Sequence, residues 1–63
     1  RRERQVLELM LEAYSNRAIA EALYISEGTA SVHVSRILRK LGVTNRTEAI
    51  RKVLRERGGP PSP

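Results

Sequence analysis

The sequence contains no cysteine, no phenylalanine and no tryptophan, and it has a single histidine. Without cysteine, the chain can form neither a disulfide framework nor a thiolate metal site. One histidine is also too few for a zinc site built from protein side chains alone. We therefore expect no metal and no cofactor. The lack of cysteine is typical of a reducing compartment, which favours a cytoplasmic location.

Long apolar runs and the usual features of an active site are also missing. No run approaches the roughly 18 residues that a membrane-spanning helix needs. No signal-peptide layout follows the charged N-terminus. There is no paired-carboxylate site, no nucleophile with a base and no phosphate-cradling glycine loop, so the chain is not expected to be an enzyme. His33 has no ligand partners at suitable spacing and is expected to pack or to form a hydrogen bond.

Positive charge, by contrast, is abundant. The 63 residues include 12 lysines and arginines against 7 acidic residues, which gives a net charge of +5. This excess favours a polyanionic partner, most often nucleic acid, although composition alone leaves DNA, RNA and anionic lipid open. The aromatic residues Tyr14 and Tyr24 are expected in the core and in a hydrophobic staple before the third helix. Base stacking of a single strand is therefore poorly supported.

Apolar residues recur at helical spacing in four segments, and no strand pattern competes with them. The predicted helices cover residues 1–13, 15–24, 27–41 and 45–57. N-caps are predicted just before or at the start of the last three helices, at Ser15 or Asn16, Ser26 and Asn45. Gly42 is the expected C-terminal glycine of the third helix. The sequence thus predicts an all-α domain over residues 1–57 and a flexible tail over residues 58–63.

The third predicted helix has two contrasting faces. Its apolar face consists of Ala30, Val34, Ile37, Leu38 and Leu41. The other side carries short side chains followed by cations, namely Ser31, Val32, Ser35, Arg36, Arg39 and Lys40. Because only a few residues separate this helix from the second, the pair has the layout of a helix-turn-helix, whose second helix enters the major groove of DNA. Short side chains allow close approach to base edges, and flanking cations would meet phosphates.

Three single residues strengthen this interpretation. Arg17 and Arg46 begin the second and fourth helices, where positive charge opposes the helix dipole, and this misfit favours an external anion. Val32 is apolar opposite the core face, where contact with a thymine methyl would explain it. Single exposed apolar residues are nevertheless common. The cations Arg36, Arg39 and Lys40 also have a plainer explanation, because cations in the last turns of a helix complement its dipole without any ligand.

Five pieces of the sequence then appear in a distinctive order. They are "RER" with "VL", "SNRAIA", "ISEGT", "VHVSRILRKLGV" and "NRTEA". Together, over Arg2 to about Ile50, they resemble the LuxR-type (GerE, NarL) helix-turn-helix DNA-binding domain of bacterial transcription regulators. The resemblance implies four helices, the third of them in the major groove, and binding as a dimer. The fourth helix commonly supplies the dimer contact in that family.

The resemblance also implies roles for individual residues. Base-facing positions of the family match Ser31, Val32 and Ser35. Positions that tend to touch phosphate match Asn16, Arg17, Thr29, Lys40 and Arg46. The chain departs from the family at Thr29-Ala30-Ser31, where "TVK" is frequent, at Ser35, which is sometimes lysine, and at Ala13, where glycine usually ends the first helix.

The fourth predicted helix raises the question of a dimer. Ile50 with one of Val53 and Leu54 could fill its core-facing side, so the remaining apolar residue could pair across a two-fold axis. Val53 and Leu54 are therefore the candidate dimer interface. The resemblance further implies a response regulator or related protein, with a receiver or ligand-sensing domain N-terminal to this chain, a homodimer on two DNA half-sites, and RNA polymerase as a further partner.

Two alternatives stay open at this point. A promoter-reading domain of a sigma factor shares the pattern of the first three helices, although the "KLGVTNRTEA" extension into a fourth helix argues against it. A helical protein-interaction or dimerisation module would have a merely solvated basic face and only nonspecific affinity for DNA. Comparing binding to duplex DNA with binding to RNA polymerase would separate the first alternative from the main hypothesis.

Overall fold

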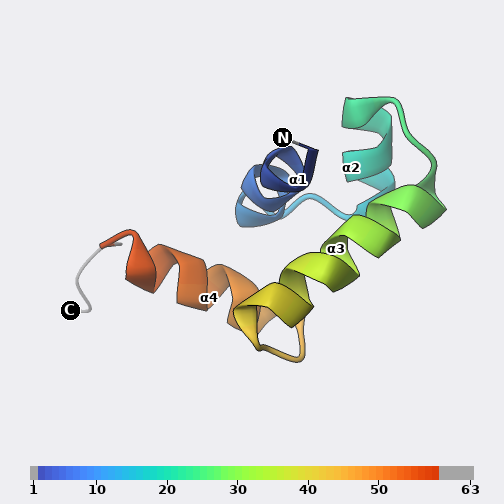
Figure 1. The fold of residues 1–63 in the computed structure, drawn as a ribbon. Helices are drawn as coiled ribbons and strands as arrows, with labels where there is room; N and C mark the ends of the chain where they lie inside the picture. The colour runs from blue at the N-terminus through green and yellow to red at the C-terminus, as the bar shows by residue number, and fades with distance from the viewer. Residues whose placement is uncertain (1, 59–63) are drawn as a thin grey trace.

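The computed structural model describes residues 2–58, and within that range the chain forms four helices and no strand (Figure 1). The helices are α1 (Arg2–Leu11), α2 (Asn16–Leu23), α3 (Glu27–Leu41) and α4 (Arg46–Glu56). The predicted all-α, four-helix class is confirmed, and α3 has the predicted bounds. Residues 59–63 of the predicted tail lie outside the described part of the chain.

The long helix α3 is the element against which the others pack. Its buried residues Ala30, Val34 and Ile37 face a core that α1, α2 and α4 complete with Val6, Met10, Ile19, Ala20, Ala49 and Val53. Val6, Met10 and Ile19 are the largest side chains with no exposed surface. One side of α3 is thus committed to the core, which leaves its opposite side facing solvent.

Side-chain oxygens cap the N-termini of three helices. Ser15 Oγ accepts a hydrogen bond from the Ala18 N–H at 3.1 Å, and Ser26 Oγ accepts one from the Thr29 N–H at 3.0 Å. Asn45 Oδ1 accepts from the backbone N–H three residues later, at 2.9 Å. These bonds satisfy N–H groups that have no partner within a helix, which stabilises each helix start. The predicted caps at Ser26 and Asn45 are confirmed, and Ser15 rather than Asn16 caps α2.

A side-chain bond ties the end of α3 to α4. The Lys52 ammonium donates to the carbonyl oxygen of Leu41 at 2.8 Å and is partly buried. Gly42 follows with φ of 70°, and the N–H of Val43 reaches back to the Leu38 carbonyl at 3.1 Å. This glycine-ended closure turns the chain toward α4, so the predicted helix stop at Gly42 is confirmed.

Two other helix ends use the same left-handed turn without glycine. Ala13 has φ of 68° and Tyr24 has φ of 57°. The expected staple role of Tyr24 is wrong, because its side chain is 94% exposed, while Ile25 packs against the core instead. Tyr14 is also on the surface rather than in the core. A residue that closes a helix in this conformation contributes its backbone to the closure, which leaves its side chain free to face water.

Replacing Ala13 by glycine is expected to stabilise the domain. A residue with a Cβ atom in the left-handed region costs roughly 1–2 kcal/mol relative to its usual conformation, and glycine has no such penalty. We expect the free energy of unfolding to rise by about 1 kcal/mol in chemical denaturation. Ala22→Gly within α2 is the matched control and should lower it by about 0.5–1 kcal/mol. Equal effects of both changes would contradict a strained turn at Ala13.

Candidate nucleic-acid interface

The connection between α2 and α3 presents the start of α3 to solvent. Ser26 Oγ donates its hydrogen to Thr29 Oγ1 at 2.8 Å while it accepts from the Thr29 N–H. The Thr29 hydroxyl hydrogen has no acceptor among the described residues and lies at the positive end of the helix dipole. This end of α3 can therefore donate hydrogen bonds to an anion from both backbone and side chain.

The three predicted base-reading residues lie on the outer side of α3. Ser31, Val32 and Ser35 are all exposed, and the apolar side chain of Val32 is 50% exposed. They lie away from the buried Ala30 and Val34. The structure therefore brings these short side chains together on one accessible surface of low bulk.

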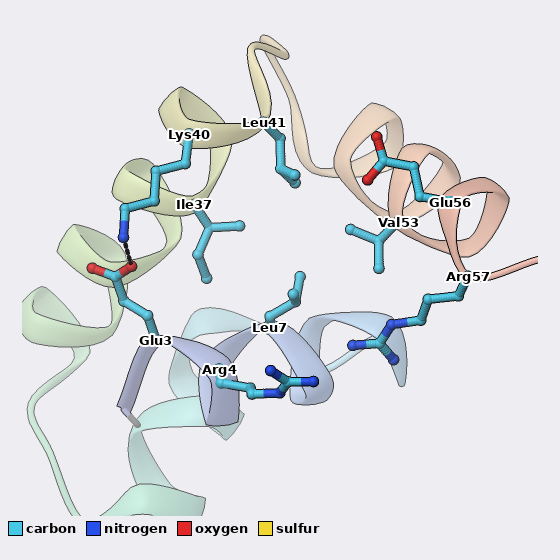
Figure 2. A pocket seen from close by; sticks show the side chains of 9 residues that line it. All are labelled: Glu3, Arg4, Leu7, Ile37, Lys40, Leu41, Val53, Glu56 and Arg57. Atoms are coloured by element: carbon cyan, nitrogen blue, oxygen red, sulfur yellow. Dashed lines mark hydrogen bonds and ion pairs between the residues drawn. The ribbon is translucent and has the colours of Figure 1, made fainter.

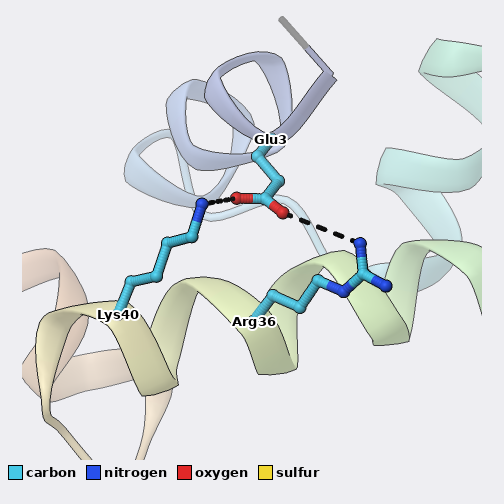
Figure 3. Close-up of polar contacts among 3 residues, drawn as sticks. All are labelled: Glu3, Arg36 and Lys40. Atoms are coloured by element: carbon cyan, nitrogen blue, oxygen red, sulfur yellow. Dashed lines mark hydrogen bonds and ion pairs between the residues drawn. The ribbon is translucent and has the colours of Figure 1, made fainter.

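The three cations that follow on α3 differ in their partners. Lys40 Nζ lies 2.7 Å from Glu3 Oε1, and Arg36 Nη1 lies 4.0 Å from Glu3 Oε2 (Figure 3). Arg39 is exposed and has no ion-pair partner among residues 2–58. The hydrogen bond from Lys40 is the main cause that holds the pKa of Glu3 below its usual value, and the charges of Lys40 and Arg36 add to it. At neutral pH this carboxylate is ionised.

Sequence reasoning did not identify Glu3 as part of this surface. It lies 37 residues from Lys40 along the chain and reaches it only because α1 packs across α3. No local spacing links the two residues, so only the tertiary arrangement could have revealed the pair.

Arg17 lies at the start of α2, as predicted. Its Nε lies 3.6 Å from Glu21 Oε2, one turn further along the helix, and the two side chains are 79% and 72% exposed. An ion pair between such solvated groups contributes little to stability. Arg17 can therefore exchange this partner for another anion at small cost.

Arg46 and Asn16 form a hydrogen bond with each other within the domain, which the sequence does not predict. Arg46 Nη1 donates to the carbonyl oxygen of Tyr14 at 2.8 Å, and Nη2 donates to Asn16 Oδ1. The charge of Arg46 at the start of α4 is thus matched by acceptors from the α1–α2 connection. The misfit that favoured an external anion at Arg46 is met within the fold, so the predicted phosphate contact of Arg46 loses that support. The predicted phosphate contact of Asn16 rests on the family resemblance alone and stays a prediction.

We expect Arg46→Ala to act mainly on stability. Hydrogen bonds that involve a charged group contribute about 1.5–3 kcal/mol each, and the contact with Asn16 is partly buried. Thermal unfolding should show a loss of about 2 kcal/mol. The matched control is Arg39→Ala, which should leave the unfolding temperature nearly unchanged and weaken DNA binding. If Arg46→Ala unfolded like the parent chain but lost DNA affinity, Arg46 would instead be a phosphate ligand.

The two candidate dimer residues on α4 differ in burial. Val53 is 6% exposed and lies in the core, whereas Leu54 is 39% exposed. Of the two candidates, Val53 therefore fills the core-facing side of α4, which leaves Leu54 as the residue that could pair across a two-fold axis. Leu54 remains accessible, and Ile50 beside it is half-buried.

A groove of about 360 Å³ opens between α1, α3 and α4, and Glu3 and Lys40 form part of its lining (Figure 2). Leu7, Ile37, Leu41 and Val53 form its apolar lining, and charged side chains from all three helices surround it. At one side, Arg57 also pairs with Glu8, at 2.5 Å between Nη2 and Oε2, and this bond lowers the pKa of Glu8. None of the predicted base-reading residues lines this groove.

The described residues also bear on metal binding, on the single histidine and on membrane-spanning helices. Residues 2–58 contain no group of three or more histidine, cysteine, aspartate or glutamate side chains that could hold a metal ion. His33 is partly buried, and its Nδ1 has no hydrogen-bond partner in the same range. Within the described range, no helix combines the length and the hydrophobicity needed to cross a membrane.

Comparison with known proteins gives a consistent result. The family model "Bacterial regulatory proteins, luxR family" matches residues 1–53. The chain is 60% identical over 50 residues to the transcriptional regulatory protein DegU of Brevibacillus brevis. The matched region covers 79% of this chain and 21% of that protein. It is 42% identical over 55 residues to the spore germination protein GerE of Bacillus subtilis, covering 87% of this chain and 74% of that one.

Two further matches complete this picture. The response regulator protein VraR of Staphylococcus aureus is 47% identical over 49 residues, or 78% of this chain and 23% of that protein. The solved structure of the transcription factor GerE superposes with a TM-score of 0.78 at 41% identity, covering 89% of this chain and 84% of that one. The chain thus spans about a fifth of the length of DegU and VraR, and most of GerE.

Proposed function

The chain belongs to the luxR family of bacterial regulatory proteins, and from that premise we propose that it reads a specific duplex DNA sequence by placing α3 in the major groove. As a helix-turn-helix domain of DNA-binding transcription regulators, it is not an enzyme.

The low-bulk outer side of α3 carries the proposal. The major groove is about 12 Å wide and admits one helix, provided that the approaching side chains are short. Ser31 and Ser35 can donate or accept hydrogen bonds at base edges, and Val32 can contact a thymine methyl. Their common exposure opposite a buried face supports a role in base reading.

Phosphate contacts would surround this base-reading surface. Arg17 and Thr29 lie near the starts of α2 and α3, where N–H groups also point outward. Arg36, Arg39 and Lys40 follow the base-reading residues along α3. Such contacts fix the register of a protein on DNA and supply much of its affinity through release of counterions.

We further propose that two copies bind adjacent half-sites through α4, with Leu54 and the half-buried Ile50 in the contact. A single short helix cannot bury the roughly 1,600 Å² of a standard interface, so this dimer would form on DNA rather than in solution. The full protein would be a cytoplasmic regulator with an N-terminal receiver or ligand-sensing domain. RNA polymerase would be a further partner at the promoter.

Selection of bound sites from random duplex DNA tests the proposal directly. The 63-residue chain should enrich one motif, and single-base changes in it should cost about 1–3 kcal/mol each. Titrations at several salt concentrations should show affinity falling steeply with salt. Uniform binding to all sequences would instead support the alternative of an interaction module with nonspecific DNA affinity. A paired motif with fixed spacing would support the dimer, and a single half-site would contradict it.

A further inference from the structure

Glu3 is the only acidic side chain within ion-pair distance of the α3 cations in residues 2–58. One of its carboxylate oxygens lies 2.7 Å from Lys40 Nζ, and the other lies 4.0 Å from Arg36 Nη1 (Figure 3). The Glu3 side chain is only 25% exposed, whereas those of Lys40 and Arg36 are 72% and 63% exposed. The carboxylate is therefore held in place, while the cations keep most of their contact with solvent.

This arrangement divides the cations of α3 into two groups. With 100° between successive residues of a helix, Arg36 and Lys40 lie toward His33, on the edge of α3 that faces α1. Arg39 projects with Val32 on the outer side and has no ion-pair partner in the described range. Glu3 thus pairs with two cations that lie on one edge of the helix, while the third lies beside the base-reading residues.

We propose that Glu3 is a positioning residue for DNA recognition, which holds Lys40 and Arg36 at the α1 edge of α3 so that they meet phosphates in a single register. The inference rests on the proposed function. A lysine ammonium has three donors, so Lys40 can keep its bond to Glu3 and donate to a phosphate at the same time.

The same carboxylate would make binding in other registers less favourable. In a complex with random DNA, Arg36 and Lys40 would meet phosphates at varied positions, and most of these positions would require them to leave the carboxylate of Glu3. In the specific complex, the phosphates would lie where the paired cations already point, so the ion pairs with Glu3 would be kept. Glu3 would therefore reduce nonspecific affinity more than specific affinity, and the ratio of the two decides how well a regulator finds its site.

Glu3→Gln tests this idea, with Glu8→Gln as the matched control. Both changes remove one carboxylate of α1 that pairs with a cation, but Glu8 pairs with Arg57, the residue that follows α4, and not with a cation of α3. At low salt, Glu3→Gln should tighten binding to random duplex DNA about fivefold, because Lys40 is released from its ion pair and can follow phosphates in any register, an effect of the size of one unit-charge interaction in water. Binding to the selected site should change less than about twofold, so the specificity ratio falls. Glu8→Gln should leave that ratio unchanged.

A second measurement keeps the inference testable if Glu3→Gln also weakens the fold. In a Lys40→Gln background, the effect of Glu3→Gln on random DNA should shrink to less than about twofold, because the two side chains act as a pair. An equal gain with Lys40 present or absent would show a simple effect of net charge and overturn the proposal. So would a fall in the ratio for Glu8→Gln. Failure of the proposed function looks different, since the unaltered chain would then show no sequence preference.

Discussion

Val32→Arg is expected to remove the preference of the domain for its selected site over random DNA. Val32 is half exposed on the outer side of α3, between Ser31 and Ser35. A long arginine at this position would hold the helix away from base edges and displace the proposed contact with a thymine methyl. Loss of a good base contact costs about 1–3 kcal/mol, so the preference should fall by roughly 5- to 150-fold. The added charge should preserve or strengthen nonspecific binding.

Competition between selected and random duplex DNA measures this change. Val32→Thr is the matched control, because it keeps nearly the same volume and adds no charge, and it should retain most of the preference. Circular dichroism should show that both variants remain helical, since residue 32 faces away from the core. A Val32→Arg variant with an unchanged site and unchanged preference would show that α3 is not the recognition helix.

Met10→Ala should have the largest effect on stability. Met10 has no exposed surface and lies in the core between the helices. Truncation of a large buried side chain to alanine costs about 2–5 kcal/mol, because it loses apolar contacts and leaves a cavity. A domain of this size buries only about 60% of its unfolded surface and has little stability to lose. We expect the variant to be largely unfolded at 37 °C, as measured by loss of helical circular dichroism.

Two other variants give this result its controls. Met10→Leu conserves volume and should cost less than about 1.5 kcal/mol. Leu54→Ala truncates a residue of similar size that is 39% exposed, so it should change stability much less and instead weaken paired binding on DNA. Similar destabilisation by Met10→Ala and Leu54→Ala would contradict the assignment of Met10 to the core and of Leu54 to the surface.

The parts of this fold that the sequence predicts are those that depend on neighbouring residues. Ser26 and Gly42 bound α3 where the sequence places them, because an N-cap hydrogen bond and a left-handed helix end are both formed within a few residues. The two faces of α3 follow from periodicity alone, so the exposure of Val32 and the burial of Val34 are both predicted correctly.

The errors come from contacts between residues far apart in the chain. Arg46 looks unpartnered in the sequence, since its acceptors, Tyr14 and Asn16, are about 30 residues away. Glu3 has no visible role until α1 lies across α3. Tyr24 looks apolar and therefore buried, but its backbone closes α2 in the left-handed conformation, and the side chain faces solvent. Hydrophobicity does not show which backbone conformation a turn requires.

For the candidate site, the sequence identifies the surface but not which of its cations are paired with a carboxylate. The base-reading residues lie on the outer side of α3, as predicted, and their contacts with DNA stay predictions. The sequence does not distinguish the three cations of α3. In the structure, Lys40 and Arg36 share the carboxylate of Glu3, and Arg39 does not. Which cations are already paired depends on helix packing, and this decides what each must give up to meet a phosphate.

The bond from Lys52 to the Leu41 carbonyl has a consequence for operator architecture. Because this bond fixes α4 against the end of α3, a dimer joined through α4 would hold its two reading helices at a set angle. Inserting one base pair between half-sites rotates one of them by about 35° around the DNA axis. Since this bond and the packing of α4 on the core resist such a rotation, the protein should favour one spacer length, and genomic sites could be sorted by spacing as well as by sequence.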